Sequence, residues 1–405
     1  MLYRLEIENF YSVRYLQVLD LRVADNVPDA PGRLDSVFDG ASERAPRVIA
    51  IFGANASGKT TVLKALGFIA WFIRASFQRQ PDTGLPCERF NSPDCADQPI
   101  RLAIEFGSSA IREPQSAIDL EIGTWRYELA LQPRASGMPI VSSEALLRKT
   151  GGKGRWVRAF ERNGRAIKTS GAFNLSSSLA KAVEHSLRDN VSFVATLAQF
   201  NHELAMSFSR QASLIFGNVV IDRLEFHDRE ATEYYALNDD ARQAVNREIK
   251  RIDLGIKQMV IEPGAGGPIA MFEHEGLEHL MPLYMQSHGT RSFLKLFPFL
   301  RMALDTGGMV LLDEIDIAIH PIVLPEIVRW FHDPIRNPRS AQLWMTCHAV
   351  SLLEELSKEE IYFTEKDNSG RTSLYGLKDI KDVRRVDNYY RKYLSGDFGA
   401  VPQIG

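Results

Sequence analysis

The sequence predicts a mixed α/β fold, and three observations support this prediction. An apolar run at 48–52 passes into a glycine-bounded loop and then into residues at helical spacing. From Ile100 onward apolar and polar residues alternate, which is typical of antiparallel strands. Another apolar run, at 309–312, ends in a pair of carboxylates. Such strands, separated by helical segments, indicate sheets that are covered by helices.

The loop after the first apolar run has the pattern of a phosphate cradle. Residues 53–60 fit G-x-x-x-x-G-K-[S/T] without a mismatch. In this pattern backbone N–H groups point at phosphate oxygens, Lys59 reaches the β- and γ-phosphates, and the Thr60 hydroxyl ligates Mg²⁺. The loop therefore predicts that a nucleoside triphosphate binds, but not what its hydrolysis is for. The residues that follow have the apolar spacing of a helix: Val62, Leu63, Leu66 and Ile69.

The composition indicates a globular protein in a reducing cytoplasm. The chain has 405 residues, 45% of them hydrophobic, which is enough for about two or three domains. Its 48 basic and 51 acidic residues give a net charge of −3. A nucleic acid or an anionic membrane would therefore have to bind to a local basic patch. The three cysteines have no metal-ligand spacing.

The N-terminal residues alternate apolar and polar side chains, which predicts two strands, at 2–7 and 16–23, and not a signal peptide. The most apolar helical segment, at 63–77, carries two basic residues and is too short to span a bilayer. We expect it to be a buried helix behind the phosphate loop, and we expect no membrane partner.

The central part of the chain is predicted to form an antiparallel meander, with strands at 100–106, 118–122, 125–131, 145–147 and 156–157. Helical spacing returns over 175–216 and 239–254, with short strands at 219–226 and 259–261. Within the meander, residues 144–168 hold eight basic residues against two acidic ones. Two interpretations remain open for this stretch: a surface that grips DNA or an acidic protein, or a solvated hairpin. The basic residues are Arg148, Lys149, Lys153, Arg155, Arg158, Arg162, Arg165 and Lys168, with Trp156 and Phe160 between them.

Asp313 and Glu314 directly follow the second apolar run, at 309–312. In a nucleotide hydrolase Asp313 would hold Mg²⁺, and Glu314 would polarise the attacking water as a general base. Three further signals surround this strand. Residues 287–290 (Ser-His-Gly-Thr) precede a helix, where they form either an anion site or an ordinary helix cap. Asp316 and His320 follow the carboxylates, and a strand at 343–348 ends in a histidine.

The order of these elements resembles the ABC-type ATPase heads of the SMC and RecF class. Asn9-Phe10 is similar to the start of those heads, and Gly53-x-Asn55-x-Ser57-Gly58-Lys59 looks like their phosphate loop. The resemblance implies a P-loop NTPase with an ABC-type two-lobed head and an antiparallel β arm. Two departures stand out: Ala56 replaces a frequent glycine, and the segment at 287–290 differs from Leu-Ser-Gly-Gly-Gln, which argues against a transporter.

More narrowly, the segment 287–290 and the C-terminal residues 393–402 look like bacterial AAA-family ATPases of abortive-infection and anti-phage systems, such as RloA-like proteins and the ATPase subunit of PARIS-type systems. In heads of this class two protomers pack head to tail, and the signature of one caps the γ-phosphate that is bound to the other. The resemblance therefore implies a homo-oligomer whose ATP and Mg²⁺ site is shared between two copies.

Carried over position by position, the resemblance implies a role for each candidate residue. Gly53, Asn55, Ser57, Gly58, Lys59, Thr60 and Thr61 would cradle ATP, and Thr60 and Asp313 would hold Mg²⁺. Glu314 would be the base, His348 the γ-phosphate sensor and Asp316 the dimer-contacting aspartate, while Ser287 and Gly289 would act in trans. Gln199 is either the magnesium-sensing glutamine or a glutamine on a helix surface.

We expect residues 1–205 to form the first ATPase lobe, with the β arm at about 100–168, residues 206–280 a helical connecting region, and residues 281–405 the second lobe. The favoured function is a cytoplasmic, oligomeric ATPase that senses infection and controls a separate effector, a nuclease or toxin encoded nearby. The alternative is a SMC/RecF-like ATPase that acts directly on DNA.

Overall fold

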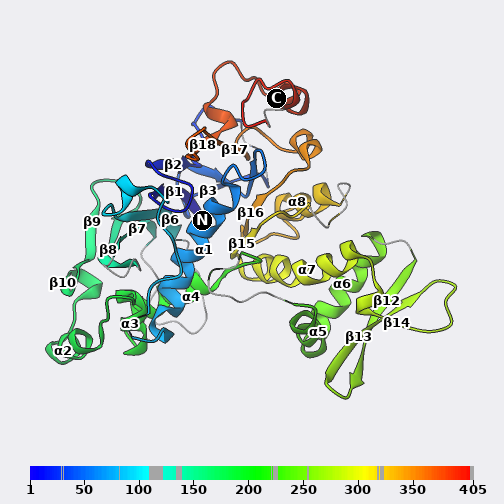
Figure 1. Ribbon diagram of the computed structural model, residues 1–405, viewed down its shortest axis with the longest axis horizontal. Coiled ribbons are helices and arrows are strands. Elements are labelled where there is room, and N and C mark those ends of the chain that lie inside the picture. Colours follow the sequence, from blue (N-terminus) through cyan, green and yellow to red (C-terminus); the bar gives the residue numbers. More distant parts are fainter. Residues whose placement is uncertain are drawn as a thin grey trace.

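The computed structural model describes residues 1–28, 30, 32–81, 83–108, 122–133, 139–219, 221, 227–252, 255–316, 319 and 323–401. Helices pack between two large sheets and on their outer sides, and a small sheet lies at one end of the long axis (Figure 1). A two-stranded ribbon of β3 (Leu34–Ser36) and β4 (Arg44–Pro46) completes the sheets.

The larger sheet is antiparallel, with strand order β10-β9-β8-β7-β6-β1-β2. The predicted meander is confirmed, and its first strand pairs with β1, so the meander and the N-terminal hairpin form one sheet. The strand predicted at 118–122 falls almost entirely outside the described residues. The strands are β1 (Leu2–Glu8), β2 (Gln17–Asp20), β6 (Ile100–Ser108), β7 (Gly123–Pro133), β8 (Pro139–Thr150), β9 (Val157–Asn163) and β10 (Ala166–Thr169).

The second sheet has the order β11-β15-β16-β5-β17-β18, and every neighbouring pair except the last is parallel. Every residue of β5, β15 and β16 is buried, which explains why their sequences are unbroken apolar runs. Because parallel strands end at the same edge, the residues after β5, β15 and β16 come together there. The strands are β5 (Val48–Phe52), β11 (Ile215–Gly217), β15 (Met309–Leu312), β16 (Gln342–Thr346), β17 (Ile361–Lys366) and β18 (Thr372–Gly376). The predicted α/β P-loop fold with an antiparallel sheet is confirmed.

Helix α1 (Lys59–Ala75) packs in the core that both large sheets line, together with α3 (Phe193–Gln199) and α4 (Glu203–Ser213). With the turn that follows, the stretch Lys59–Gln78 is long and apolar enough to cross a membrane, and it is the one such stretch in the described part of the chain. It is longer than the predicted segment at 63–77. Its most apolar window is 67% buried, however, as expected for the core helix of a globular protein.

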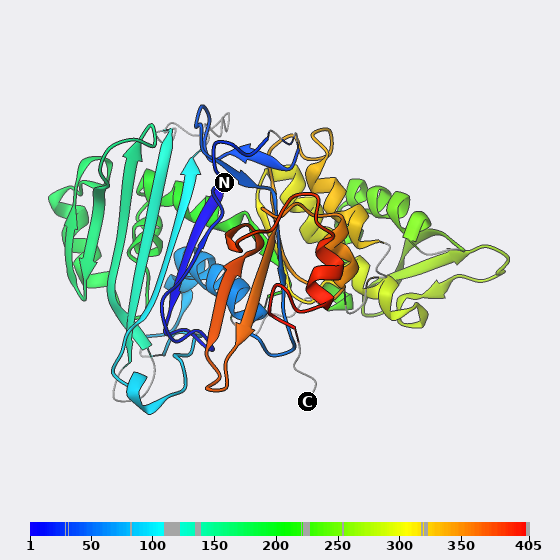
Figure 2. The ribbon, with the colours of Figure 1, turned by 90° about the horizontal axis from the view of Figure 1, so that it is seen from above.

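Of the remaining helices, α2 lies beside α3 at the end of the antiparallel sheet, and the others surround the parallel sheet and the small sheet (Figures 1 and 2). The described part of residues 206–280, predicted as a helical connection, contains most of α4, the helices α5 and α6, a strand of the parallel sheet, and a hairpin where only the strand 259–261 was predicted. The strand predicted at 219–226 lies mostly outside the described residues. The elements are α2 (Ser177–Ser186), α5 (Asp228–Leu237), α6 (Asp239–Ile252), α7 (His288–Thr306), α8 (Leu324–His332), α9 (Tyr389–Leu394), β12 (Ile256–Gly264), β13 (Gly267–His274) and β14 (Met281–Pro282). Short 3₁₀ turns are η1 (Ser76–Gln78), η2 (Pro93–Cys95), η3 (Gly171–Phe173), η4 (Leu283–Met285), η5 (Val350–Glu354) and η6 (Leu377–Asp379).

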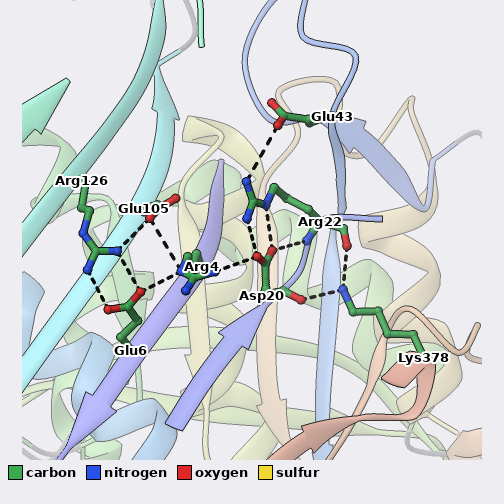
Figure 3. A network of polar contacts seen from close by, with 8 residues as sticks. All are labelled: Arg4, Glu6, Asp20, Arg22, Glu43, Glu105, Arg126 and Lys378. Atoms are coloured by element: carbon green, nitrogen blue, oxygen red, sulfur yellow. Dashed lines mark hydrogen bonds and ion pairs between the residues drawn. The ribbon is translucent and has the colours of Figure 1, made fainter. Parts of the chain in front are cut away.

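A network of charges covers the face of the antiparallel sheet that points away from α1 (Figure 3). At one end Arg126 contacts Glu6 at 2.7 Å and Glu105 at 2.8 Å. The network reaches the end of β2, where Lys378 donates a hydrogen bond to the carbonyl oxygen of Asp20 at 2.6 Å. It therefore links the antiparallel sheet to the segment after β18.

Candidate nucleotide-binding site

The phosphate loop lies between β5 and α1, and its backbone takes conformations that favour glycine. Gly53 and Gly58 have φ angles of 151° and 107°. A Cβ atom on Gly53 would lie 2.4 Å from the carbonyl oxygen of Thr364, so only glycine fits there. Lys59 folds back over the loop, and its Nζ donates to the carbonyl oxygens of Gly53 at 2.9 Å and Ala54 at 3.0 Å. The loop is thus wound around the lysine.

A chain of hydroxyl groups supports the loop from β17, β18 and the β1–β2 turn. Ser57 Oγ lies 2.6 Å from Thr364 Oγ1, and Thr372 Oγ1 donates to the Ser57 carbonyl oxygen at 2.8 Å. Thr372 Oγ1 also lies 2.9 Å from Ser12 Oγ, which is 3.1 Å from Thr61 Oγ1. Sequence patterns gave no signal for this support, because the residues come from three distant segments.

Asp313 follows β15 and is held from three directions. Its Oδ1 accepts hydrogen bonds from Thr60 Oγ1 at 3.1 Å and from Thr346 Oγ1 at 2.6 Å. Its backbone N–H donates to Asn218 Oδ1 at 2.8 Å, and Asn218 Nδ2 donates to its carbonyl oxygen at 3.0 Å. The next residue, Glu314, is exposed and has a φ of 50°, in the left-handed region. Thr346 and Asn218 were not predicted from the sequence.

His348 lies on the loop after β16, next to the same carboxylates. Its backbone N–H donates to Asp316 Oδ2 at 2.8 Å. Burial lowers the pKa of Lys59, and the nearby carboxylates of Glu314, Asp313 and Asp316 oppose this shift. Lys59 and the three carboxylates are therefore close enough to interact electrostatically, and the backbone of His348 lies beside them.

Lys59, Glu314, Asp316 and His348 line a cavity of about 1550 Å³ together with a second wall. That wall is formed by Tyr11 and by the loop at 87–91. Tyr11 donates its backbone N–H to the carbonyl oxygen of Glu88 at 2.9 Å, and the Asn9 side chain accepts the backbone N–H of Phe90 at 3.2 Å, so the loop is fastened to the β1–β2 turn. The cavity exceeds the usual size of a small-ligand pocket and has room for a whole nucleotide. The lining residues that were predicted are Asn55, Ser57, Gly58, Lys59, Thr60, Thr61, Glu314, Asp316 and His348.

The donors at this edge fit Mg²⁺ bound with a nucleotide. Magnesium prefers hard oxygen ligands and is usually held by one or two protein groups together with substrate phosphates. Thr60 and Asp313 supply such oxygens, and they already lie within 3.1 Å of each other. The described part of the chain contains no group of three or more His, Cys, Asp or Glu residues that could hold a metal ion. Two oxygen donors of this kind suit a magnesium ion that is also bound by substrate phosphates.

Other predicted residues lie outside this cavity lining. Ser287 is exposed at the N-cap of α7, where its Oγ accepts the Thr290 N–H at 3.1 Å, and Gly289 follows in the first turn. Gln199 is exposed at the last residue of α3 and is not among the residues that line the cavity. His320 lies outside the described residues.

The basic stretch at 144–168 exposes fewer of its basic side chains to a binding partner than its sequence suggested. Arg162 is fully buried, 3.5 Å from Glu144, and it donates to the Arg188 carbonyl oxygen at 2.9 Å. Phe160 is buried too, and Lys149 lies 4.4 Å from the centre of the Trp156 ring. Two interpretations were left open for this stretch, and a surface that grips a nucleic acid could not include Arg162 and Phe160, because β9 turns both into the core.

Residues 48–354 match the model of a family described as "AAA domain, putative AbiEii toxin, Type IV TA system". A search of curated proteins finds no significant match. Among solved structures, the chain is similar to the SMC head domain from Thermotoga maritima, with 13% identity and a TM-score of 0.41 over 93% of this chain and 98% of that one. It is also similar to an SmcHead bound to the C-winged helix domain of ScpA, with 12% identity and a TM-score of 0.46 over 93% and 97%. A Smc head with an extended coiled coil, bound to a ScpA domain derived from Pyrococcus furiosus, gives 11% identity and a TM-score of 0.44 over 93% and 96%.

Proposed function

The chain belongs to the AAA domain family described as putative AbiEii toxin of a type IV TA system, and on this basis we propose that it is an ATP-binding and ATP-hydrolysing oligomer that controls a separate effector in bacterial anti-phage defence. One observation carries the ATPase part. Lys59, Glu314 and His348 come from three different segments and line a single cavity, and Asp313 is hydrogen-bonded to Thr60 at its edge. A phosphate loop without a catalytic role would not need this convergence.

In the proposed reaction the chain's residues bind, orient and move a proton. Backbone N–H groups of the phosphate loop and Lys59 bind the phosphates. Thr60 and Asp313 would hold Mg²⁺, which neutralises charge on the phosphates when it is bound. Glu314 accepts a proton from the attacking water, and His348 orients the terminal phosphate.

The oligomeric part is supported by the position of Ser287 and Gly289. Both lie at the start of α7, outside the cavity of their own chain, and Ser287 is exposed. A hydroxyl and backbone N–H groups at the N-terminus of a long helix favour an anion. We infer that this end of α7 completes the site of a second copy, and that ATP binding closes the two copies on each other.

Control of a separate effector is favoured over direct action on DNA. The family description concerns a toxin–antitoxin system, and the basic stretch presents fewer groups than its sequence suggested. Of its remaining arginines, Arg158 lies 3.6 Å from Glu161 and Arg165 lies 3.7 Å from Asp189. Such pairs reduce the charge that is offered to a phosphate backbone.

The test uses Glu314→Gln, with Lys59→Ala as its control. Glu314→Gln should bind ATP, hydrolyse it at least about 100-fold more slowly and accumulate as an ATP-bound oligomer that retains the product of the adjacent gene. Lys59→Ala should not bind ATP. Undiminished hydrolysis in both variants would contradict the site, and loss of assembly in Glu314→Gln would contradict the scaffold role.

A further inference from the structure

Thr346 is the last residue of β16 and contacts Asp313, the predicted metal ligand, and Glu314, the predicted general base. It is fully buried. Its Oγ1 lies 2.6 Å from Asp313 Oδ1 and 2.7 Å from the backbone nitrogen of Glu314. One hydroxyl group therefore connects the side chain of one carboxylate residue to the backbone of the next.

The direction of both hydrogen bonds follows from chemistry. A backbone N–H can only donate, so Glu314 donates to Thr346 Oγ1. The hydroxyl has one proton of its own, and the neighbouring acceptor is a carboxylate oxygen, so Thr346 donates to Asp313. A hydrogen bond to an ionised acceptor is the stronger kind. The Thr346 hydroxyl is thus fully committed to these two residues.

The hydrogen bond between Thr346 and Glu314 involves a residue in an unusual backbone conformation. Glu314 has a φ of 50°, which residues other than glycine rarely adopt. Such conformations persist where surrounding contacts hold them, and they cluster at functional sites. The hydrogen bond to Thr346 holds the backbone of Glu314 where its side chain faces the nucleotide cavity.

Packing does not explain the hydroxyl. The rest of β16 is buried, and valine has nearly the shape of threonine and is equally favourable in a strand. A hydroxyl in this core is stabilising only because it has polar partners, and both of its partners belong to the site.

We propose that Thr346 is a positioning residue of the hydrolytic site, which orients Asp313 toward Mg²⁺ and Glu314 toward the attacking water at the same time. This inference rests on the proposed ATPase function. Thr346 takes part in no chemical step and moves no proton to the substrate. Its role is to hold the carboxylates of Asp313 and Glu314 in fixed positions relative to each other. Groups that orient metal ligands in this way commonly change metal affinity or activity by about 10- to 100-fold when they are removed.

The test compares Thr346→Val with Thr346→Ser, and uses Thr196→Val as the matched control. Thr196 is also fully buried, but its hydroxyl donates to a helix carbonyl oxygen at 2.9 Å, away from the site. Two quantities are measured for each variant: steady-state kcat and KM for ATP, and the Mg²⁺ concentration at which a fluorescent ATP analogue is half-maximally bound.

Thr346→Val should lower kcat by about 10- to 100-fold and raise the Mg²⁺ requirement by about tenfold, while binding of metal-free nucleotide changes less than about twofold. Thr346→Ser should restore both values, and Thr196→Val should leave both unchanged. Equal losses in Thr346→Ser and Thr346→Val, or none in Thr346→Val, would overturn the proposal. If Thr346→Val does not fold, Thr346→Ala takes its place. If the wild type binds Mg²⁺–ATP without hydrolysing it, the proposed hydrolysis fails, and the Mg²⁺ measurement still decides the role of Thr346.

Discussion

Asp316 accepts a hydrogen bond from the backbone N–H of His348, at 2.8 Å, within the same chain. The resemblance to ATPase heads implied that this aspartate contacts a second copy. In the structure its carboxylate joins the loop after β15 to the loop after β16, and its Oδ1 is buried without a hydrogen-bond partner among the described residues. The loop that carries Glu314 and the loop that carries His348 are therefore linked by a hydrogen bond.

Asp316→Ala should lower kcat about tenfold, because the His348 loop loses its anchor, while ATP binding stays within about twofold. Steady-state kinetics and a direct binding titration check this. Asp316→Asn keeps an oxygen acceptor and serves as the milder variant. An unchanged kcat together with weaker self-association would assign Asp316 to an interface instead.

Ala56 occupies a left-handed conformation in the phosphate loop, with a φ of 60°. This explains why glycine is frequent at the matching position of related loops. Since the left-handed region costs a residue with a side chain roughly 1–2 kcal/mol, Ala56→Gly should leave stability unchanged or raise it by up to about 1 kcal/mol. Urea unfolding measures this. A loss of stability would mean that the loop does not hold this conformation in solution.

Arg162 should matter for folding and not for nucleic acid. Arg162→Met removes the partner of buried Glu144 and should destabilise the protein by about 3–5 kcal/mol. Arg155 is exposed, so Arg155→Glu should change stability by less than about 0.5 kcal/mol. Denaturant unfolding compares the two. Salt-sensitive DNA binding that disappears in Arg155→Glu would support the alternative function.

Glu360 should make stability depend on pH in the acidic range. Burial would raise its pKa, but the hydrogen bond from His332 and the charges of His332 and Arg33 outweigh burial and lower it from 4.5. Between the lowered pKa and 4.5 the unfolded chain binds more protons, so the contribution of Glu360 is complete above about pH 4.5 and is lost as the pH falls.

Glu360→Gln should therefore cost about 2–3 kcal/mol near neutral pH, because it removes the charge of the buried carboxylate that accepts hydrogen bonds from Arg33 and His332. The difference from the wild type should shrink as the pH falls below 4.5. Unfolding curves recorded at several pH values measure this. A difference that does not vary with pH would show that the carboxylate charge contributes nothing.

The sequence predicted the parts of the site that follow a periodic pattern or a fixed motif. The loop at 53–60 and the carboxylates Asp313 and Glu314 each follow an apolar strand, so their place at one sheet edge could be expected. Asn218 and Thr346 could not be found in this way, because a single asparagine or threonine at a strand end is common and has no pattern of its own.

The sequence left the role of the basic stretch open, because a count of its charges does not say which face of the strand each side chain occupies. Arg162 lies two residues after Phe160 on the same strand, so both point to the same side of the sheet. An apolar Phe160 already indicated that this side is the core. What the sequence did not reveal is the partner, Glu144, which lies opposite Arg162 on β8.

Mixing two inactive variants tests the shared nucleotide site most directly. Lys59→Ala copies retain Ser287, and Ser287→Arg copies retain the phosphate loop, so a mixed pair contains one complete site if Ser287 acts in trans. Each variant alone should be inactive, and an equal mixture should recover roughly a quarter of wild-type ATPase activity if copies pair at random. A mixture that stays inactive, or a Ser287→Arg variant as active as the wild type, would contradict the shared site.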